Sequence, residues 1–229
     1  MTHMYKIASK RRGILDFFSV TTNLIILNVL FFIIAMIWTI FVRANFFDYI
    51  ALKPSNILQG KYLWTFLTSM FMHAGVLHLF VNMLSLMFVG NFTEKIIGRK
   101  RFLWFYLIAG LFAGLLFVGI EYLFPSGLDV GAVGASGALF GVVGLLMLLT
   151  PNLPVYIMFI PIPIKMKYAA PGMLLVLWLI SLAPLAFGGE QILIGNTAHL
   201  GGLLVGIIYG VYLRNKYKRK VAFISKQFS

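Results

Sequence analysis

The chain contains no cysteine and very little charge. Of its 229 residues, 11% are charged, and only six residues are acidic. Soluble domains carry about 25% charged residues. The lack of cysteine excludes disulfides, thiol nucleophiles and thiolate metal ligands, and the shortage of charge excludes an ordinary soluble domain. A hydrophobic content of 61% and a mean hydropathy of +0.95 instead indicate a protein that crosses a membrane several times.

Six apolar segments follow one another along the chain. They are Leu24–Val42, Gly75–Asn91, Phe102–Ile120, Ser136–Leu149, Ala169–Phe187 and Thr197–Leu213. A membrane-spanning helix needs about 20 residues. The segment that begins at Ser136 has only 14, which reach about 21 Å as a helix. We therefore expect an all-α integral membrane protein with six transmembrane helices, in which the fourth helix is short and central.

Residues 150–168 break this pattern. They are apolar in part, but Pro151, Pro154, Pro161 and Pro163 bracket the stretch. Prolines at this spacing exclude a long helix, since each removes a backbone donor and clashes with the preceding turn. We expect an extended loop that packs against the bundle or lies at the membrane interface.

The basic residues gather on one side of the six-helix order. All lysines and arginines other than Arg43, Lys53 and Lys61 fall within four ranges on that side: 1–23, 95–101, 165–167 and 214–229. Basic loops remain in the cytoplasm, so both termini are expected there. The net charge of +13 therefore indicates topology and contact with anionic membrane lipids. A nucleic-acid site is not expected, because the cations lie in four separate segments.

This topology predicts three parts for the chain. Residues 1–23 form a basic cytoplasmic segment, residues 24–213 form the six-helix membrane domain, and residues 214–229 form a basic cytoplasmic tail. The same order places the starts of the second, fourth and sixth helices on the outer side of the membrane.

The unusual polar residues of the membrane domain lie at those three helix starts. His73, His78 and Asn82 belong to the second helix, Ser136 begins the fourth and His199 begins the sixth. Polar residues within membrane spans are costly and are read as functional by default. The fourth helix is too short for a hydrocarbon core of about 30 Å. Ser136 is therefore expected below the outer surface, on the floor of a polar cavity.

Glycine spacing predicts which helices meet. Gly137, Gly141 and Gly144 share one face of the fourth helix, and residues 202, 206 and 210 are glycines on one face of the sixth. Small residues at such spacing let helix backbones approach closely. His199 shares the glycine face of the sixth helix, so we expect it beside Ser136. A serine next to an imidazole is the general arrangement of a nucleophile and its base.

The second helix adds possible hydrogen-bond donors to this pair. His78 and Asn82 are four residues apart and face the same way; donors of this kind stabilise a developing oxyanion, as does the N–H of Ser136. No acidic residue on the outer side is placed to orient His199, so we expect a dyad. Each feature alone has a simpler reading, as helix packing, a structural histidine or polar contact between helices. Together they indicate a hydrolytic site.

Three stretches of the chain together resemble the rhomboid family of intramembrane serine proteases. They are HAGVLHLFVNM at 73–83, GASGALFG at 134–141 and AHLGGLLVG at 198–206. The resemblance implies a Ser136–His199 catalytic dyad with Asn82 and His78 at the oxyanion. It also implies that Phe140 stacks on His199. Five further residues are expected to support the site: His73, Gly134, Gly137, Gly202 and Gly206. Glu94 is implied to be a structural acid.

One departure from the family concerns the loop before the second helix. A Trp-Arg pair is frequent there, whereas Trp64 is followed here by Thr65. The catalytic positions are unchanged, but the anchoring of that loop at the membrane surface is called into question.

The function implied is cleavage of transmembrane protein substrates near their outer ends, in a prokaryotic cell membrane, without metal or cofactor. Two alternatives remain open from the sequence. One is a catalytically silent relative that binds membrane clients, although such relatives usually lack the serine or histidine. The other is a transporter or proton channel that uses His73, His78 and His199, which lacks a buried carboxylate partner.

Overall fold

A computed structural model describes residues 18–42, 46–125, 127–156, 162–184 and 195–228. Its helices are α1 (Val20–Val42), α2 (Phe46–Ile50), α3 (Pro54–Leu58), α4 (Thr65–Thr68), α5 (Val76–Ser85), the π-helix η2 (Leu86–Gly90), α6 (Asn91–Ile97), α7 (Arg99–Leu123), α8 (Ser136–Leu149), α9 (Met166–Leu182), α10 (Asn196–Lys216) and α11 (Lys218–Lys226). Two short strands are also present, β1 (Pro154–Val155) and β2 (Ile164–Lys165).

Every apolar segment predicted from the sequence forms a helix in its described part. Within the described residues, four helical stretches are long and apolar enough to cross a membrane: Val20–Phe41, Val76–Ile97, Arg99–Leu123 and Asn196–Lys216. The apolar helices α8 and α9 are shorter. The end of the predicted fifth segment, residues 185–187, lies outside the described residues. The described part of the chain is therefore that of a helical membrane protein, with four candidate spans and two shorter apolar helices. The count of six spans stays a prediction.

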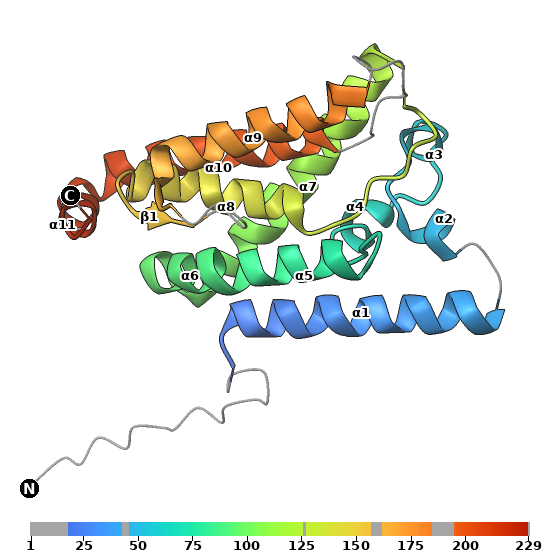
Figure 1. The fold of residues 1–229 in the computed structure, drawn as a ribbon, viewed down its shortest axis with the longest axis horizontal. Coiled ribbons are helices and arrows are strands. Elements are labelled where there is room, and N and C mark those ends of the chain that lie inside the picture. The colour runs from blue at the N-terminus through green and yellow to red at the C-terminus, as the bar shows by residue number, and fades with distance from the viewer. Residues whose placement is uncertain (1–17, 43–45, 126, 157–161, 185–194, 229) are drawn as a thin grey trace, which may run out of the picture.

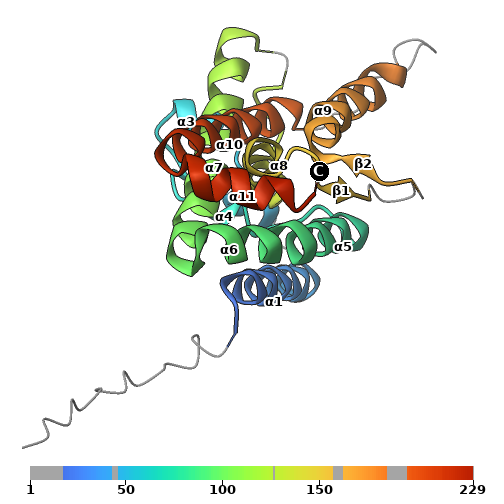
Figure 2. The same ribbon diagram turned by 90° about the vertical axis from the view of Figure 1, so that its left-hand side faces the viewer.

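Helix α8 occupies the middle of the bundle. Helices α5, α7, α9 and α10 surround it in two perpendicular views (Figures 1 and 2). Eleven of its 14 residues are buried. Helix α1 lies at the edge of the bundle, beside α5 and η2, and buries only a narrow stripe. The central position predicted for the short helix that begins at Ser136 agrees with this arrangement.

The buried carboxylate of Glu94 holds the start of α1. One carboxylate oxygen accepts a hydrogen bond from the N–H of Val20 at 2.9 Å. The other accepts from the N–H and the hydroxyl of Thr21, both at 2.8 Å. The first N–H groups of a helix have no partner within it, and an anion there also interacts favourably with the helix dipole. Glu94 therefore fixes the start of α1 to α6, a structural role.

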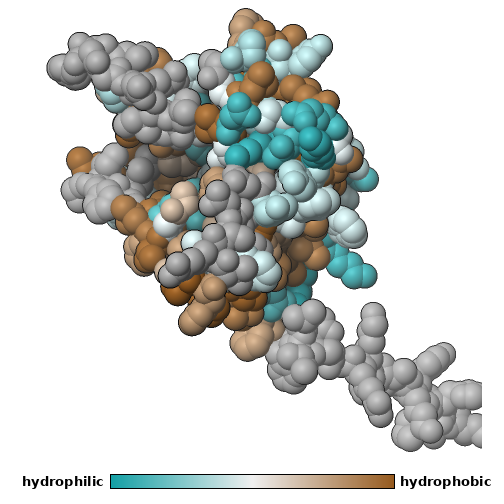
Figure 3. Space-filling view, turned by 90° about the vertical axis from the view of Figure 1, so that its right-hand side faces the viewer, coloured by the Kyte–Doolittle hydropathy of each residue, from teal (hydrophilic) through white to brown (hydrophobic). Residues whose placement is uncertain are grey.

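The three short helices α2, α3 and α4 lie at the opposite end of the bundle from α11 (Figure 1). No helix was predicted in this segment. Hydrophilic residues gather in one patch on this end of the molecule, while apolar side chains cover other parts of the surface (Figure 3). Trp64 donates its indole N–H to the carbonyl of Tyr49 at 2.9 Å, and Tyr62 packs edge-on against both rings. This aromatic cluster anchors the segment although Thr65 follows Trp64.

The segment 150–168 contains more regular structure than the predicted loop. Strands β1 and β2 pair antiparallel, with Pro154 opposite Lys165 and Val155 opposite Ile164. This ladder is a small departure from an all-α fold. Helix α9 begins at Met166, earlier than predicted, so that Pro171 lies inside the helix rather than near its start.

The basic tail is also helical, which the sequence reasoning missed. Helix α11 begins directly after α10, and none of its residues is buried. The ring of Phe228, just beyond α11, packs edge-on against Phe92 at a centroid distance of 5.7 Å. The tail therefore contacts the start of α6, after the end of α10.

Candidate active site

Ser136 and His199 meet at the interface of α8 and α10. The Nε2 atom of His199 lies 2.8 Å from Oγ of Ser136, within hydrogen-bond distance. Ser136 is the first residue of α8 and is partly exposed, whereas His199 is buried in the first turn of α10. This is the geometry that a base needs to take a proton from a hydroxyl.

The imidazole of His199 is held by stacking. The ring of Phe140 lies parallel to it, with centroids 4.5 Å apart and an interplanar angle of 20°. Within the described part of the chain, the second ring nitrogen, Nδ1 of His199, has no hydrogen-bond partner. Among the described residues, the ring is therefore oriented by an aromatic side chain and by Ser136, without a third polar group.

Glycine allows the close contact between α8 and α10. A Cβ atom placed on Gly202 would overlap the carbonyl oxygen of Gly137, and one on Gly206 would overlap that of Gly141. The missing Cβ atoms of Gly137 and Gly141 themselves point elsewhere, toward two alanines of α7, residues 113 and 109. The sequence predicted the contact of the two helices but not this third helix in the packing.

His78 lies beside the serine on the side of α5. A Cβ atom placed on Gly134 would lie 2.8 Å from Cε1 and 2.9 Å from Nε2 of His78. The same Cβ atom would lie 3.7 Å from Oγ of Ser136. Gly134 has a φ of +125°, a region that other residues rarely adopt. Gly134 thus leaves space for His78 next to Ser136.

His73 and Ala74 position the ring of His78. The imidazole of His73 is almost fully buried and packs edge-on against His78, with centroids 5.1 Å apart. Nδ1 of His78 accepts a long hydrogen bond, 3.4 Å, from the N–H of Ala74. Because Nδ1 acts as an acceptor, the proton of the neutral ring lies on Nε2, the nitrogen beside Gly134.

Asn82 lies one turn beyond His78 and is buried. Its Nδ2 donates a hydrogen bond to the carbonyl oxygen of His78 at 2.8 Å. A carboxamide carries two N–H donors, so one of them is left for another acceptor. Its Oδ1 has no partner among the described residues.

Two backbone contacts hold the loop that leads into Ser136. Leu52 and Ala132 form an isolated antiparallel bridge with two hydrogen bonds of 3.0 Å. The N–H of Gly134 donates to the carbonyl oxygen of Ser69 at 2.9 Å. These contacts tie the residues before α8 to the segment that contains α3 and α4. No sequence signal identified Leu52 or Ser69, since both act through the backbone.

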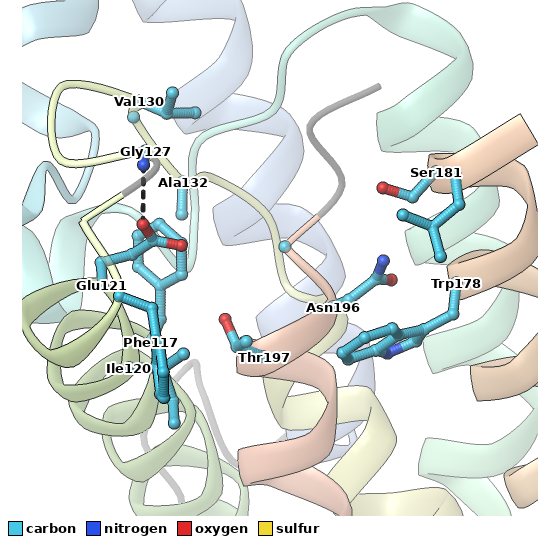
Figure 4. Close-up of a pocket in the computed structure, with 14 residues that line it drawn as sticks. Phe117, Ile120, Glu121, Gly127, Val130, Ala132, Trp178, Ser181, Asn196 and Thr197 are labelled. Carbon is cyan, nitrogen blue, oxygen red and sulfur yellow. Dashed lines mark hydrogen bonds between the residues drawn. The ribbon is translucent and has the colours of Figure 1, made fainter. Parts of the chain in front are cut away.

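A cavity of about 200 Å³ lies at the start of α10, between α7 and α9. Asn196 and Thr197 of α10 reach it from one side, Trp178 and Ser181 of α9 from another, and Glu121 of α7 from a third (Figure 4). Neither Ser136 nor His199 is among the described residues that line it. The cavity predicted above Ser136 is therefore a different space and stays a prediction.

Neither Glu121 nor Asp129, the acidic residues whose side chains are described near this site, contacts His199. Glu121 accepts a hydrogen bond from the N–H of Gly127 at 2.8 Å and so holds the loop that follows α7 (Figure 4). Asp129 is exposed. Glu190 and the side chain of Asp48 lie outside the described residues.

The fold and this site define a helical integral membrane protein with a serine hydroxyl paired to an imidazole. The sequence family described as the Rhomboid domain matches residues 60–216. RHOMBOID-like protein 1 of Arabidopsis thaliana is 38% identical over 70% of this chain and 37% of its own length. Rhomboid protease GluP of Bacillus subtilis is 35% identical over 68% of this chain and 27% of its own. Rhomboid protein 1, mitochondrial, of Saccharomyces cerevisiae is 28% identical over 74% and 48%.

The chain belongs to the rhomboid family. The resemblance drawn from its three sequence stretches is thereby confirmed. The chain spans between about a quarter and a half of the length of these relatives. Membership of this family and the apolar helices support an integral membrane location. The relatives include plant, bacterial and mitochondrial proteins, so they do not select a prokaryotic cell membrane.

Proposed function

We propose that the protein is an intramembrane serine protease that uses Ser136 as nucleophile and His199 as base. The observation that carries the proposal is the 2.8 Å contact between Nε2 of His199 and Oγ of Ser136. Membership of a family that includes a named protease supports it.

The first half of the reaction uses both residues of the pair. His199 takes the proton of Ser136 while Oγ attacks the carbonyl carbon of the scissile peptide bond. His199 then gives that proton to the leaving amine, and the peptide bond breaks to leave an acyl group on Ser136. In the second half, His199 takes a proton from water, the hydroxide attacks the acyl group, and the proton returns to Ser136.

The negative charge that develops on the carbonyl oxygen needs hydrogen-bond donors. The N–H of Ser136 has no partner within α8 because it begins the helix. The Nε2–H of His78 and the second N–H of Asn82 complete the proposed set, with His73 and Gly134 positioning His78. Each such donor is typically worth about 3–4 kcal/mol in the transition state.

The proposed topology has six spans, with α8 and α9 as the shorter two. The described basic residues that begin α7 and end α10 and α11 lie at one end of the bundle (Figure 1). We place that end in the cytoplasm, because basic segments remain there. Residues 1–23 and 214–229 then lie on the cytoplasmic side, and residues 24–213 form the membrane domain. The pair of Ser136 and His199 then opens toward the outer side, where a transmembrane substrate unwinds and enters.

Cleavage in a bilayer tests this function. Purified protein and a panel of tagged single-span proteins are placed together in liposomes, and cleavage products are sized by mass spectrometry. We expect cuts near the outer end of a span by the wild type and by Ser85→Ala, which removes a different membrane-embedded serine. Ser136→Ala is expected to leave the panel intact. Equal cleavage by Ser136→Ala would contradict the proposal, as would a panel left intact by the wild type.

A further inference from the structure

A long apolar groove of about 700 Å³ runs along the outside of the bundle between α1 and α7. Its walls come from the first half of α1 and the first turn of α7. The apolar lining includes Leu24, Leu27 and Leu30 from α1 and Leu103 from α7. Arg99 and Lys100 line it at the start of α7.

The packing of α1 explains why this groove exists. Helix α1 is buried along a single stripe at helical spacing, formed by Thr21, Leu24, Asn28, Phe32 and Ala35. Other side chains of α1 that line the groove stay open, with Leu27 at 46% and Leu30 at 51% exposure. The helix thus rests mainly on α5 and η2 and touches α7 less, so that among the described residues a groove remains between α1 and α7.

One end of the groove is positively charged. The guanidinium of Arg99 is held by a 2.7 Å hydrogen bond to the carbonyl of Phe18, and its Nε lies 3.9 Å from Glu94. Glu94 is buried and accepts bonds from the start of α1. Lys100, next along the helix, is exposed. Both cations therefore lie at one end of the groove, whose lining is otherwise apolar apart from Asn23; in the proposed topology this is the cytoplasmic end.

The length of the groove matches one leaflet of a membrane. From Val20 to Leu30 the helix rises about 15 Å, which is half of a hydrocarbon core of about 30 Å. We propose that the groove binds one anionic glycerophospholipid of the leaflet beside the basic helix ends. Its phosphate group lies at Arg99 and Lys100, and one acyl chain follows Leu27 and Leu30. Basic pockets between membrane helices are a known setting for anionic lipid head groups.

Charge distinguishes this occupant from others that the groove could hold. A second copy of this chain, inserted in the same direction, would bring its own basic ends against Arg99 and Lys100. The chain has 19 basic and six acidic residues, so like charges would meet. Free phosphate would satisfy the cations but leave the leucines of the groove exposed to lipid without a specific partner.

A photoreactive lipid tests the site directly. The whole protein is reconstituted in nanodiscs with phosphatidylglycerol that carries a diazirine on one acyl chain, and cross-linked peptides are mapped. We expect labels on the peptides that contain Leu27, Leu30 and Leu103. Unlabelled phosphatidylglycerol should compete, whereas phosphatidylcholine and glycerol phosphate should not. Lys100→Gln should lower labelling about fivefold, the typical contribution of one basic residue at an anionic surface.

Lys218→Gln is the matched control, because Lys218 is also exposed and basic but lies on α11. Its labelling should equal that of the wild type, and thermal unfolding should show both variants folded. Uniform labelling around the bundle, labelling unaffected by Lys100→Gln, or equal competition by phosphatidylcholine would overturn the proposal. So would a cross-link from the groove to a second copy of the chain. Ser136→Ala should label like the wild type, so this test is independent of proteolysis.

Discussion

Gly202 of α10 lies directly against the backbone carbonyl of Gly137 in α8, with no space for even one methyl group between them. One turn before Gly202 is His199, and one residue before Gly137 is Ser136. The contact of the two glycines therefore sets the separation of the two helices at the level where the hydroxyl meets the imidazole.

Gly202→Ala should separate α8 from α10. Its Cβ would overlap a backbone oxygen that cannot rotate away, and overpacking of this kind typically costs about 1–3 kcal/mol. We expect a lower unfolding temperature in detergent and a large loss of peptidase rate. The matched change is Gly172→Ala in α9, where a Cβ would meet nothing within 4 Å. If Gly202→Ala proved as stable and active as Gly172→Ala, the packing account of the dyad would be wrong.

His78→Ala and Asn82→Ala should lower kcat by about 10²-fold or more while leaving KM nearly unchanged. The reason is that these donors act on charge that appears only in the transition state. Val81→Ala, between them on α5, is the control for truncation of this helix. A rise in KM with kcat preserved would instead assign the two residues to substrate binding.

Phe140→Leu tests whether stacking orients the base. Leucine keeps an apolar side chain but loses the parallel ring 4.5 Å from the imidazole. Aromatic pairs contribute about 0.5–1.5 kcal/mol beyond their buried area, so we expect kcat to fall up to about tenfold. The neighbouring change Leu139→Met should have a much smaller effect on kcat. An unchanged kcat in Phe140→Leu would show that the ring of His199 is oriented in some other way.

Glu94→Gln should destabilise the fold without acting on the chemistry. The carboxylate accepts three hydrogen bonds at the start of α1, and hydrogen bonds to charged groups contribute about 1.5–3 kcal/mol. Thermal unfolding should therefore shift down, while kcat of the folded protein stays the same. Glu121→Gln, which disturbs a single bond to Gly127, should shift unfolding less. The reverse order of stability would refute the capping role.

The sequence predicted the apolar helices and the meeting of Ser136 with His199 because both depend on simple periodicities. Long apolar runs mark membrane helices, and glycines at helical spacing mark close contacts. Spacing alone does not say which neighbour fills a glycine face. Gly137 and Gly141 also leave space for two alanines of α7. The pattern of residues on α8 does not identify α7 as this neighbour.

The short elements could not be predicted for a related reason. Helix α11 has nine residues, and isolated helices of that length are marginal in water. The ladder of β1 and β2 and the bridge between Leu52 and Ala132 join backbone groups distant in sequence. Such elements depend on contacts that exist only after the bundle has formed.

The most direct test of the central claim is the rate of covalent labelling by a fluorophosphonate, with the modified residue identified by mass spectrometry. An activated serine displaces the leaving group on phosphorus, whereas an ordinary serine in a helix does not. We predict a single adduct on Ser136 in the wild type, slowed by several orders of magnitude in His199→Ala and absent in Ser136→Ala. An adduct on another residue, or labelling of Ser136 at the same rate without His199, would contradict the account.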